Sequence, residues 1–174
     1  PEHGLMRTKF LSPVLLLFAT VFSAAIFTGT AAQAGEKTYK AAAMVIGSAW
    51  AAETPRGAKT GAAYFTMTNG GSKADYLISV TSPVARNVAL HAHRMVGNVM
   101  QMAPVLGITI PAGQLVALKP GGRHVMLIGL TKPLKDGDKV PLVLSFKYSG
   151  SIQIVAVVGL PPGARKKGRS YKPH

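Results

Sequence analysis

Apolar and polar residues alternate over short runs along most of the chain, and this pattern predicts β-strands. The runs are rich in Val, Ile, Tyr and Thr, and no window carries a convincing helical period. The predicted strands cover residues 39–50, 61–68, 76–81, 87–95, 99–104, 114–118, 125–130, 139–148 and 151–158. About nine short strands in one domain predict an all-β antiparallel sandwich or barrel.

The segments between these runs contain turn residues. Each offers a glycine, asparagine or aspartate that tolerates positive φ. They are 69–71, 111–113, 120–122, 136–138 and 149–151. These turns support short hairpin connections over long crossovers.

The N-terminal residues resemble a secretory signal peptide. A basic segment around Arg7 and Lys9 leads into the apolar stretch 14–27, and Ala32-Gln33-Ala34 follows. This arrangement predicts cleavage before Gly35. A retained membrane anchor is the alternative, but the apolar stretch is shorter than the roughly 20 residues that span a bilayer.

Three parts of the chain follow from this pattern. Residues 1–34 are predicted to be the leader and signal peptide, 35–160 the β-sandwich domain, and 161–174 a flexible tail. Five of the basic residues lie in that tail, which has no acidic residue.

Charge and cysteine content exclude several classes of function. The chain has 20 basic and 6 acidic residues, a formal net charge of +14, and no cysteine. The charge favours an acidic partner or an anionic membrane surface, and the signal peptide argues against nucleic acid. Without cysteine, the chain has no disulfide, no thiolate metal site and no cysteine nucleophile.

The candidate chemistry lies in two histidines and two methionines. They are His91, Met102, His124 and Met126. Thioether sulfur is a soft ligand that suits Cu(I) above other metals. Because residues two apart on a strand share a face about 7 Å apart, His124 and Met126 point the same way.

The remaining histidines and methionines have less specific interpretations. His93 shares the face of His91; a substitute or supporting role for it stays open, but a surface role is favoured. Met95 and Met100 are expected to pack or to form a pocket rim. The residues expected in the core are Met44, Met67 and Trp50, and His174 could assist Cu(II) capture.

Charge distinguishes among metals. No Asp or Glu occurs from Tyr76 to Lys135, so a site built there has only neutral ligands. A divalent ion would keep its full charge in a positively charged protein, whereas Cu(I) brings one charge. Zinc, calcium and magnesium are disfavoured on both counts, and a blue-copper centre would need a cysteine.

The segment from Val88 to Leu130 resembles the periplasmic PCuAC copper chaperones. Their signature is a histidine, a methionine and a His-x-Met pair at the separations seen here, and similarity extends to 99–102, 110–113 and 118–122. One departure is Gly97-Asn98, where the family commonly has Asp-Gly, so the hairpin is expected to turn differently.

This resemblance implies a cupredoxin-like antiparallel Greek-key β-sandwich in the periplasm. A monomer is expected, because a carrier with four ligands of its own needs no partner to complete the site. The resemblance also implies that one Cu(I) is bound through His91, Met102, His124 and Met126. Family members deliver copper toward the CuA site of cytochrome c oxidase, often alongside Sco-type copper proteins. These would be the partners.

Two other classes of function compete with this interpretation. One is a non-metal adhesion or scaffold β-sandwich whose methionines merely pack. The other is a hydrolase, which ranks last because no G-x-S-x-G motif is present and residues 76–135 offer no carboxylate to orient a histidine base.

Overall fold

The computed structural model describes residues 37–164, and every element in that range is a strand. The predicted leader and most of the predicted tail lie outside the described residues. The strands are β1 (Tyr39–Ala41), β2 (Met44–Ala51), β3 (Thr60–Asn69), β4 (Asp75–Thr81), β5 (Ala85–Val96), β6 (Val99–Pro104), β7 (Ile108–Ile110), β8 (Leu115–Ala117), β9 (His124–Leu130), β10 (Lys139–Phe146) and β11 (Gly150–Val158).

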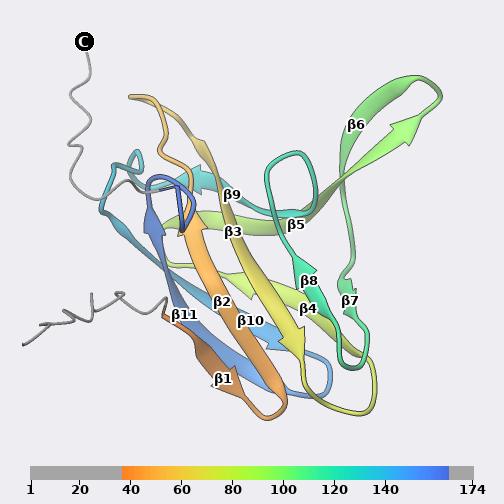
Figure 1. The fold of residues 1–174 in the computed structure, drawn as a ribbon. Coiled ribbons are helices and arrows are strands. Elements are labelled where there is room, and N and C mark those ends of the chain that lie inside the picture. The colour runs from red at the N-terminus through yellow and green to blue at the C-terminus, as the bar shows by residue number, and fades with distance from the viewer. Residues whose placement is uncertain (1–36, 165–174) are drawn as a thin grey trace, which may run out of the picture. The chain divides into compact units, whose positions relative to one another are not determined.

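One continuous hydrogen-bonded path joins most of these strands, in the order β6-β5-β9-β3-β2-β11-β10-β4-β7. β1 pairs with β2, and β8 pairs with β3. The path folds over, so that β4 also approaches β5, and β7 approaches β3 (Figure 1). The predicted all-β sandwich is confirmed. Among residues 37–164 there is no helix long and apolar enough to cross a membrane.

One strand pair departs from the antiparallel prediction. β11 runs parallel to β2, with Val157 opposite Trp50 and Val158 opposite Ala51. A parallel pair needs a long connection between its strands, and here most of the domain lies between them. The hydrogen bond from Gly159 N to Ala51 O extends this contact by one residue.

The strand boundaries match the predicted runs closely, with two exceptions. Residues 39–50 form two strands because the chain reverses at Ala42, which has φ of 49° without a glycine or asparagine to signal it. β7 was missed because three residues are too short to show a period.

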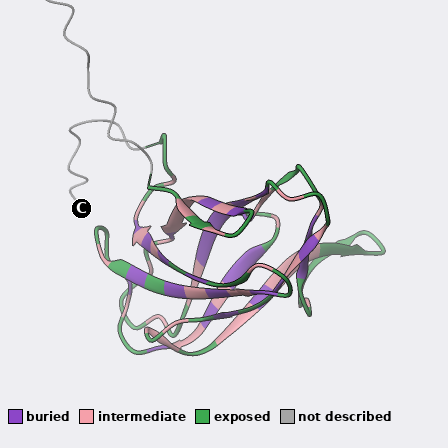
Figure 2. Cartoon of the chain, turned by 90° about the horizontal axis from the view of Figure 1, so that it is seen from below, coloured by how far each residue is buried: buried purple, intermediate pink, exposed green. Residues whose placement is uncertain are grey.

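The core lies between the folded faces of the sheet and is apolar. Met44 and Met67 are fully buried there, as predicted, whereas Trp50 is only half-buried. The largest other members are Phe65, Ile46, Leu77, Ile108, Ile110, Leu127, Leu134, Leu142, Leu144 and Ile154. Figure 2 shows buried positions alternating with more exposed ones along the strands, as expected when one face packs inward.

The hairpin of β5 and β6 extends away from the rest of the fold (Figure 1). Its two-residue turn is Gly97-Asn98, and only Gly97 has positive φ, at 60°. A glycine with positive φ at the first turn position is typical of a type II′ hairpin, whereas Asp-Gly favours type I′. The difference from the family's turn stays a prediction.

Asp75, at the start of β4, holds the turn between β10 and β11. It is buried, and its carboxylate accepts hydrogen bonds from the backbone N–H groups of Tyr76 at 2.7 Å, Tyr148 at 3.0 Å and Ser149 at 3.0 Å. Burial alone would raise the pKa of Asp75, but hydrogen bonds from Ser149, Tyr76 and Tyr148 outweigh it and lower this pKa.

We predict that this carboxylate makes stability depend on acid. Because its folded pKa is depressed, its contribution is complete above about pH 3.9, the unfolded value, and is lost as pH falls through the folded pKa. Asp75→Asn should lower the urea midpoint at neutral pH and flatten its decline below pH ~4. Parallel curves for the two proteins would contradict this.

Candidate metal site

Three neighbouring strands place the four predicted ligands on one face of the sheet. His91 on β5 lies directly opposite His124 on β9, and Met126 lies opposite Ala89. Met102 on β6 lies opposite His93, not opposite His91. Because cross-strand partners and residues two apart share a face, all four predicted ligands share one face, and His93 joins them.

The three histidine rings gather around His124. Its ring centroid lies 5.8 Å from that of His91 and 5.6 Å from that of His93. His93 is half-buried and faces the other rings, so the surface role favoured from the sequence is wrong. The local pattern put His93 on the correct face but could not show that β9 lies beside it.

A single carbonyl orients two of these rings. Gly122 O lies 3.1 Å from His124 Nδ1 and 3.2 Å from His93 Nδ1. Since a carbonyl only accepts, each Nδ1 must be the donor, and in the neutral form of either ring the lone pair is then on Nε2. Holding a ligand histidine by its second nitrogen is a common device in metal sites.

The turn before β9 places this carbonyl. Gly121 has φ of 74°, a conformation that favours glycine. Lys119 closes the turn from both ends, because its N–H donates to Arg123 O at 2.8 Å and its carbonyl accepts from Gly122 N at 3.0 Å. The Pro120-Gly121-Gly122 motif therefore aims a carbonyl at the histidines.

His91 has a different environment. Its Nδ1 is buried and has no hydrogen-bond partner among residues 37–164. Burial and the neighbouring His124 both lower the pKa of His91, so its ring stays neutral to lower pH than a free imidazole. A buried lone pair or N–H without a partner costs free energy, and a metal ion bound by this ring would offset that cost.

An aromatic row backs the site. Trp50 on β2 stacks on Tyr64 on β3 with centroids 4.5 Å apart, and Tyr64 lies 6.4 Å from His124. Burial raises the pKa of Tyr64, which keeps its hydroxyl protonated. These rings were not predicted as part of the site, since they come from strands remote in sequence.

A pocket of about 290 Å³ opens beside three of the predicted ligands, Met102, His124 and Met126. Its other walls are the backbone and side chains of residues 52–55 and 60–62. Glu53 is among them and was missed, because it lies far from the histidines in sequence. It brings a carboxylate to a pocket that the sequence predicted to have neutral ligands only.

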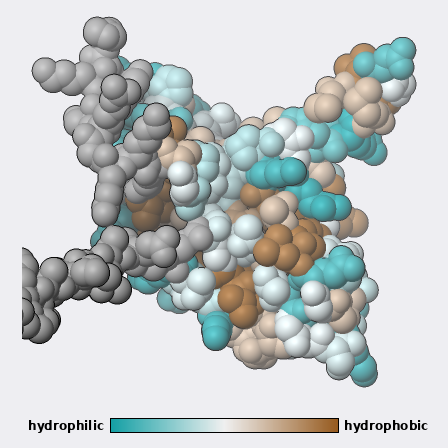
Figure 3. Space-filling view, in the orientation of Figure 1, coloured by the Kyte–Doolittle hydropathy of each residue, from teal (hydrophilic) through white to brown (hydrophobic). Residues whose placement is uncertain are grey.

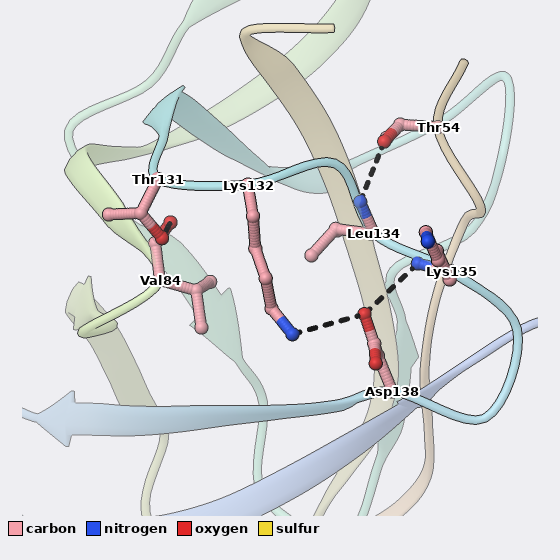
Figure 4. A network of polar contacts seen from close by, with 7 residues as sticks. All are labelled: Thr54, Val84, Thr131, Lys132, Leu134, Lys135 and Asp138. Carbon is pink, nitrogen blue, oxygen red and sulfur yellow. Dashed lines mark hydrogen bonds and ion pairs between the residues drawn. The ribbon is translucent and has the colours of Figure 1, made fainter. Parts of the chain in front are cut away.

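Hydrogen bonds anchor the wall that carries Glu53. Thr54 donates its N–H to Leu134 O at 3.0 Å, and its hydroxyl accepts from Leu134 N at 2.8 Å. Figure 4 shows this pair beside the ion pair of Lys132 with Asp138 at 3.6 Å. The loop after β9 is thereby tied to the pocket wall.

The four predicted ligands differ in their exposure to solvent. His124 is only 5% exposed, His91 and Met126 are half-buried, and Met102 is 49% exposed. The described residues contain no group of three or more His, Asp or Glu side chains arranged to hold a metal.

Comparison with known proteins identifies the family. The sequence profile of the family described as "Putative lipoprotein LpqE-like" matches residues 44–158. The chain belongs to the LpqE-like family. A curated relative, "Putative lipoprotein Lxx21020" from Leifsonia xyli subsp. xyli, is 39% identical over 98 residues. That match spans 55% of this chain and 58% of the relative's length.

Solved structures confirm the resemblance of this LpqE-like chain to PCuAC domains. The copper-bound PCuAC domain from PmoF2 superposes with a TM-score of 0.62 and 26% identity, covering 72% of this chain and 99% of that domain. The Cu(I)-bound solution structure of DR1885 from Deinococcus radiodurans gives 0.51 and 32%, covering 74% and 84%. The fold is therefore that of copper-binding PCuAC domains.

We predict that acid destabilises the metal-free protein through His91. Its folded pKa lies below the unfolded value of about 6.5, so the unfolded chain binds the proton first. Stability should be unaffected by this group above pH ~7 and should fall as pH drops below about 6.5. Melting temperatures of wild type and His91→Gln between pH 5 and pH 8 test this; an unchanged slope in the variant would contradict it.

Proposed function

We propose that this LpqE-like protein is an exported copper(I) carrier. It binds one Cu(I) through His91, Met102, His124 and Met126, and passes the ion to a respiratory copper protein. The observation that carries the proposal is the cross-strand pair of His91 and His124, with the buried, unpartnered Nδ1 of His91 and both thioethers on the same face. The similarity to copper-bound PCuAC domains supports it.

The donor set suits a soft monovalent ion. Two neutral imidazoles and two thioethers carry no charge, and thioethers are poor ligands for zinc, calcium or magnesium. Glu53, exposed at the pocket wall, can offset one positive charge without being a ligand. Cu(I) matches this environment in both softness and charge.

The graded exposure of the ligands suits transfer. Met102 reaches the surface on the projecting hairpin, while His124 is buried beneath it. An acceptor's ligand can replace the Met102 thioether first, with the histidines still bound, so the ion is never free. The protein acts as a carrier and not as an enzyme, in keeping with relatives and structural neighbours that are lipoproteins and copper-binding domains.

The PCuAC resemblance supports an acceptor at the CuA site of cytochrome c oxidase, or a Sco-type protein. The net charge of +14 favours acidic docking surfaces and contact with anionic membranes. The lipoprotein description of the family supports export to the periplasm. Lipid attachment is not part of the proposal, because these 174 residues contain no cysteine to carry a lipid.

We predict that loss of one of the two ligands on β9 weakens Cu(I) binding sharply. His124→Ala and Met126→Ala should each reduce affinity by about tenfold or more, or ~1.4 kcal/mol, in an anaerobic competition titration with a Cu(I) chelator. Arg94→Gln serves as a control, since Arg94 lies on the face of the hairpin opposite the ligands. X-ray absorption of the loaded protein should show both nitrogen and sulfur neighbours. Unchanged affinity in both alanine variants would sink the proposal.

We also predict that Cu(I) raises the melting temperature of wild type. A ligand that binds only the folded state stabilises it by about 2.7 kcal/mol when present at 100 times its dissociation constant. The rise should be much smaller in the double variant His91→Ala/His124→Ala. A scaffold sandwich with packing methionines would show no rise in either protein.

A further inference from the structure

The projecting hairpin carries more methionines than the proposed site uses. Met95 on β5 lies directly opposite Met100 on β6. The next pair on the same face, two residues closer to the body, is His93 opposite Met102. These pairs share one face, which is also the face of His91. The opposite face of the hairpin carries the pair Arg94 and Gln101. Thioethers and charged groups are therefore segregated.

These methionines do not contribute to the core. Met95 is 60% exposed and Met100 is 61% exposed, whereas Met44 and Met67 are fully buried. The expectation that they pack is therefore wrong for Met95 and Met100, and the alternative, a pocket rim, is not supported, since neither lines the pocket beside Met102 in the described residues. In the space-filling view the hairpin stands out from the body and mixes hydrophobic with hydrophilic residues (Figure 3). Met95 and Met100 are therefore accessible to a metal ion from solvent.

We propose that Met95, Met100 and Met102 form an accessory site for Cu(I), through which the ion reaches the His/Met site. Directly opposed side chains have Cβ atoms about 5 Å apart, and successive rows lie about 7 Å apart. Methionine is long, unbranched and flexible, so thioethers at these spacings can converge on one ion. A site of thioethers alone selects the softest monovalent metals.

Met102 connects the two sites. It lies one row from Met95 and Met100 on the hairpin, and it lines the pocket with His124 and Met126. Copper can therefore pass by ligand exchange: a Cu–S bond to Met100 or Met95 breaks as bonds to the buried ligands form, with the ion monovalent throughout. The identity of the cargo rests on the proposed function, whereas the existence of a thioether site on the hairpin does not.

The test uses the full chain labelled with ¹³C at the methionine methyl groups. Silver(I), which is monovalent, soft and stable in air, is added stepwise while the methyl resonances are followed by NMR. Met102 and Met126 should shift with the first equivalent, and Met95 and Met100 with the second. Met44 and Met67 should stay unchanged because they are buried in the core. If the Met95 and Met100 resonances do not shift at excess silver, the proposal is overturned. Their role would then be that of an apolar contact surface.

Two matched variants separate this proposal from the previous one. Met95→Leu/Met100→Leu keeps the apolar character of the hairpin; it should remove the second equivalent, leave the affinity of the first unchanged, and slow Cu(I) uptake from a chelated donor severalfold. His124→Ala/Met126→Leu should remove the first equivalent and preserve the Met95 and Met100 shifts. If Met126 never shifts in wild type while the hairpin responds, the proposed function fails and the accessory site stands. Unchanged stoichiometry and uptake in the leucine variant would refute the accessory site alone.

Discussion

The antiparallel register between β5 and β9 is the constraint on which the site depends. Leu90 and Val125 are opposed on the inner face of this pair and buried in the core. With these side chains fixed inward, their neighbours His91 and His124 must point outward, opposite each other. A slip of one residue would move every side chain to the other face. Hydrophobic burial on one face thus determines which ligand atoms meet on the other.

Local patterns in the sequence predicted much of this structure. The period of two residues located ten of the eleven strands of the described residues, with β1 and β2 merged into one run, and placed His124 and Met126 on one face. It could not reveal pairing between distant strands, which depends on how the whole sheet closes. For that reason Met102 was not expected opposite His93, and Glu53 and Tyr64 were not expected near His124 at all. The reversal at Ala42 escaped because its residues carry no turn signal.

The site combines rigidity at its base with freedom at its edge. His124 is held by the Gly122 carbonyl and by its contact with Tyr64. Its strand, β9, lies between β5 and β3 in the sheet. Met102 lies on β6, the last strand of the hydrogen-bonded path, and within residues 37–164 this strand pairs on one side only. Ligands placed on regular strands keep their geometry, while the terminal strand can adjust. This division suits a protein that must hold an ion firmly and still release it.

The stacked rings behind the site have a practical consequence. The chain has a single tryptophan, Trp50, and it stacks on Tyr64, which in turn approaches His124. All of the indole fluorescence therefore comes from a side chain that is separated from His124 by one tyrosine ring. Events at that imidazole can be followed by emission intensity in the native chain, and no dye needs to be attached.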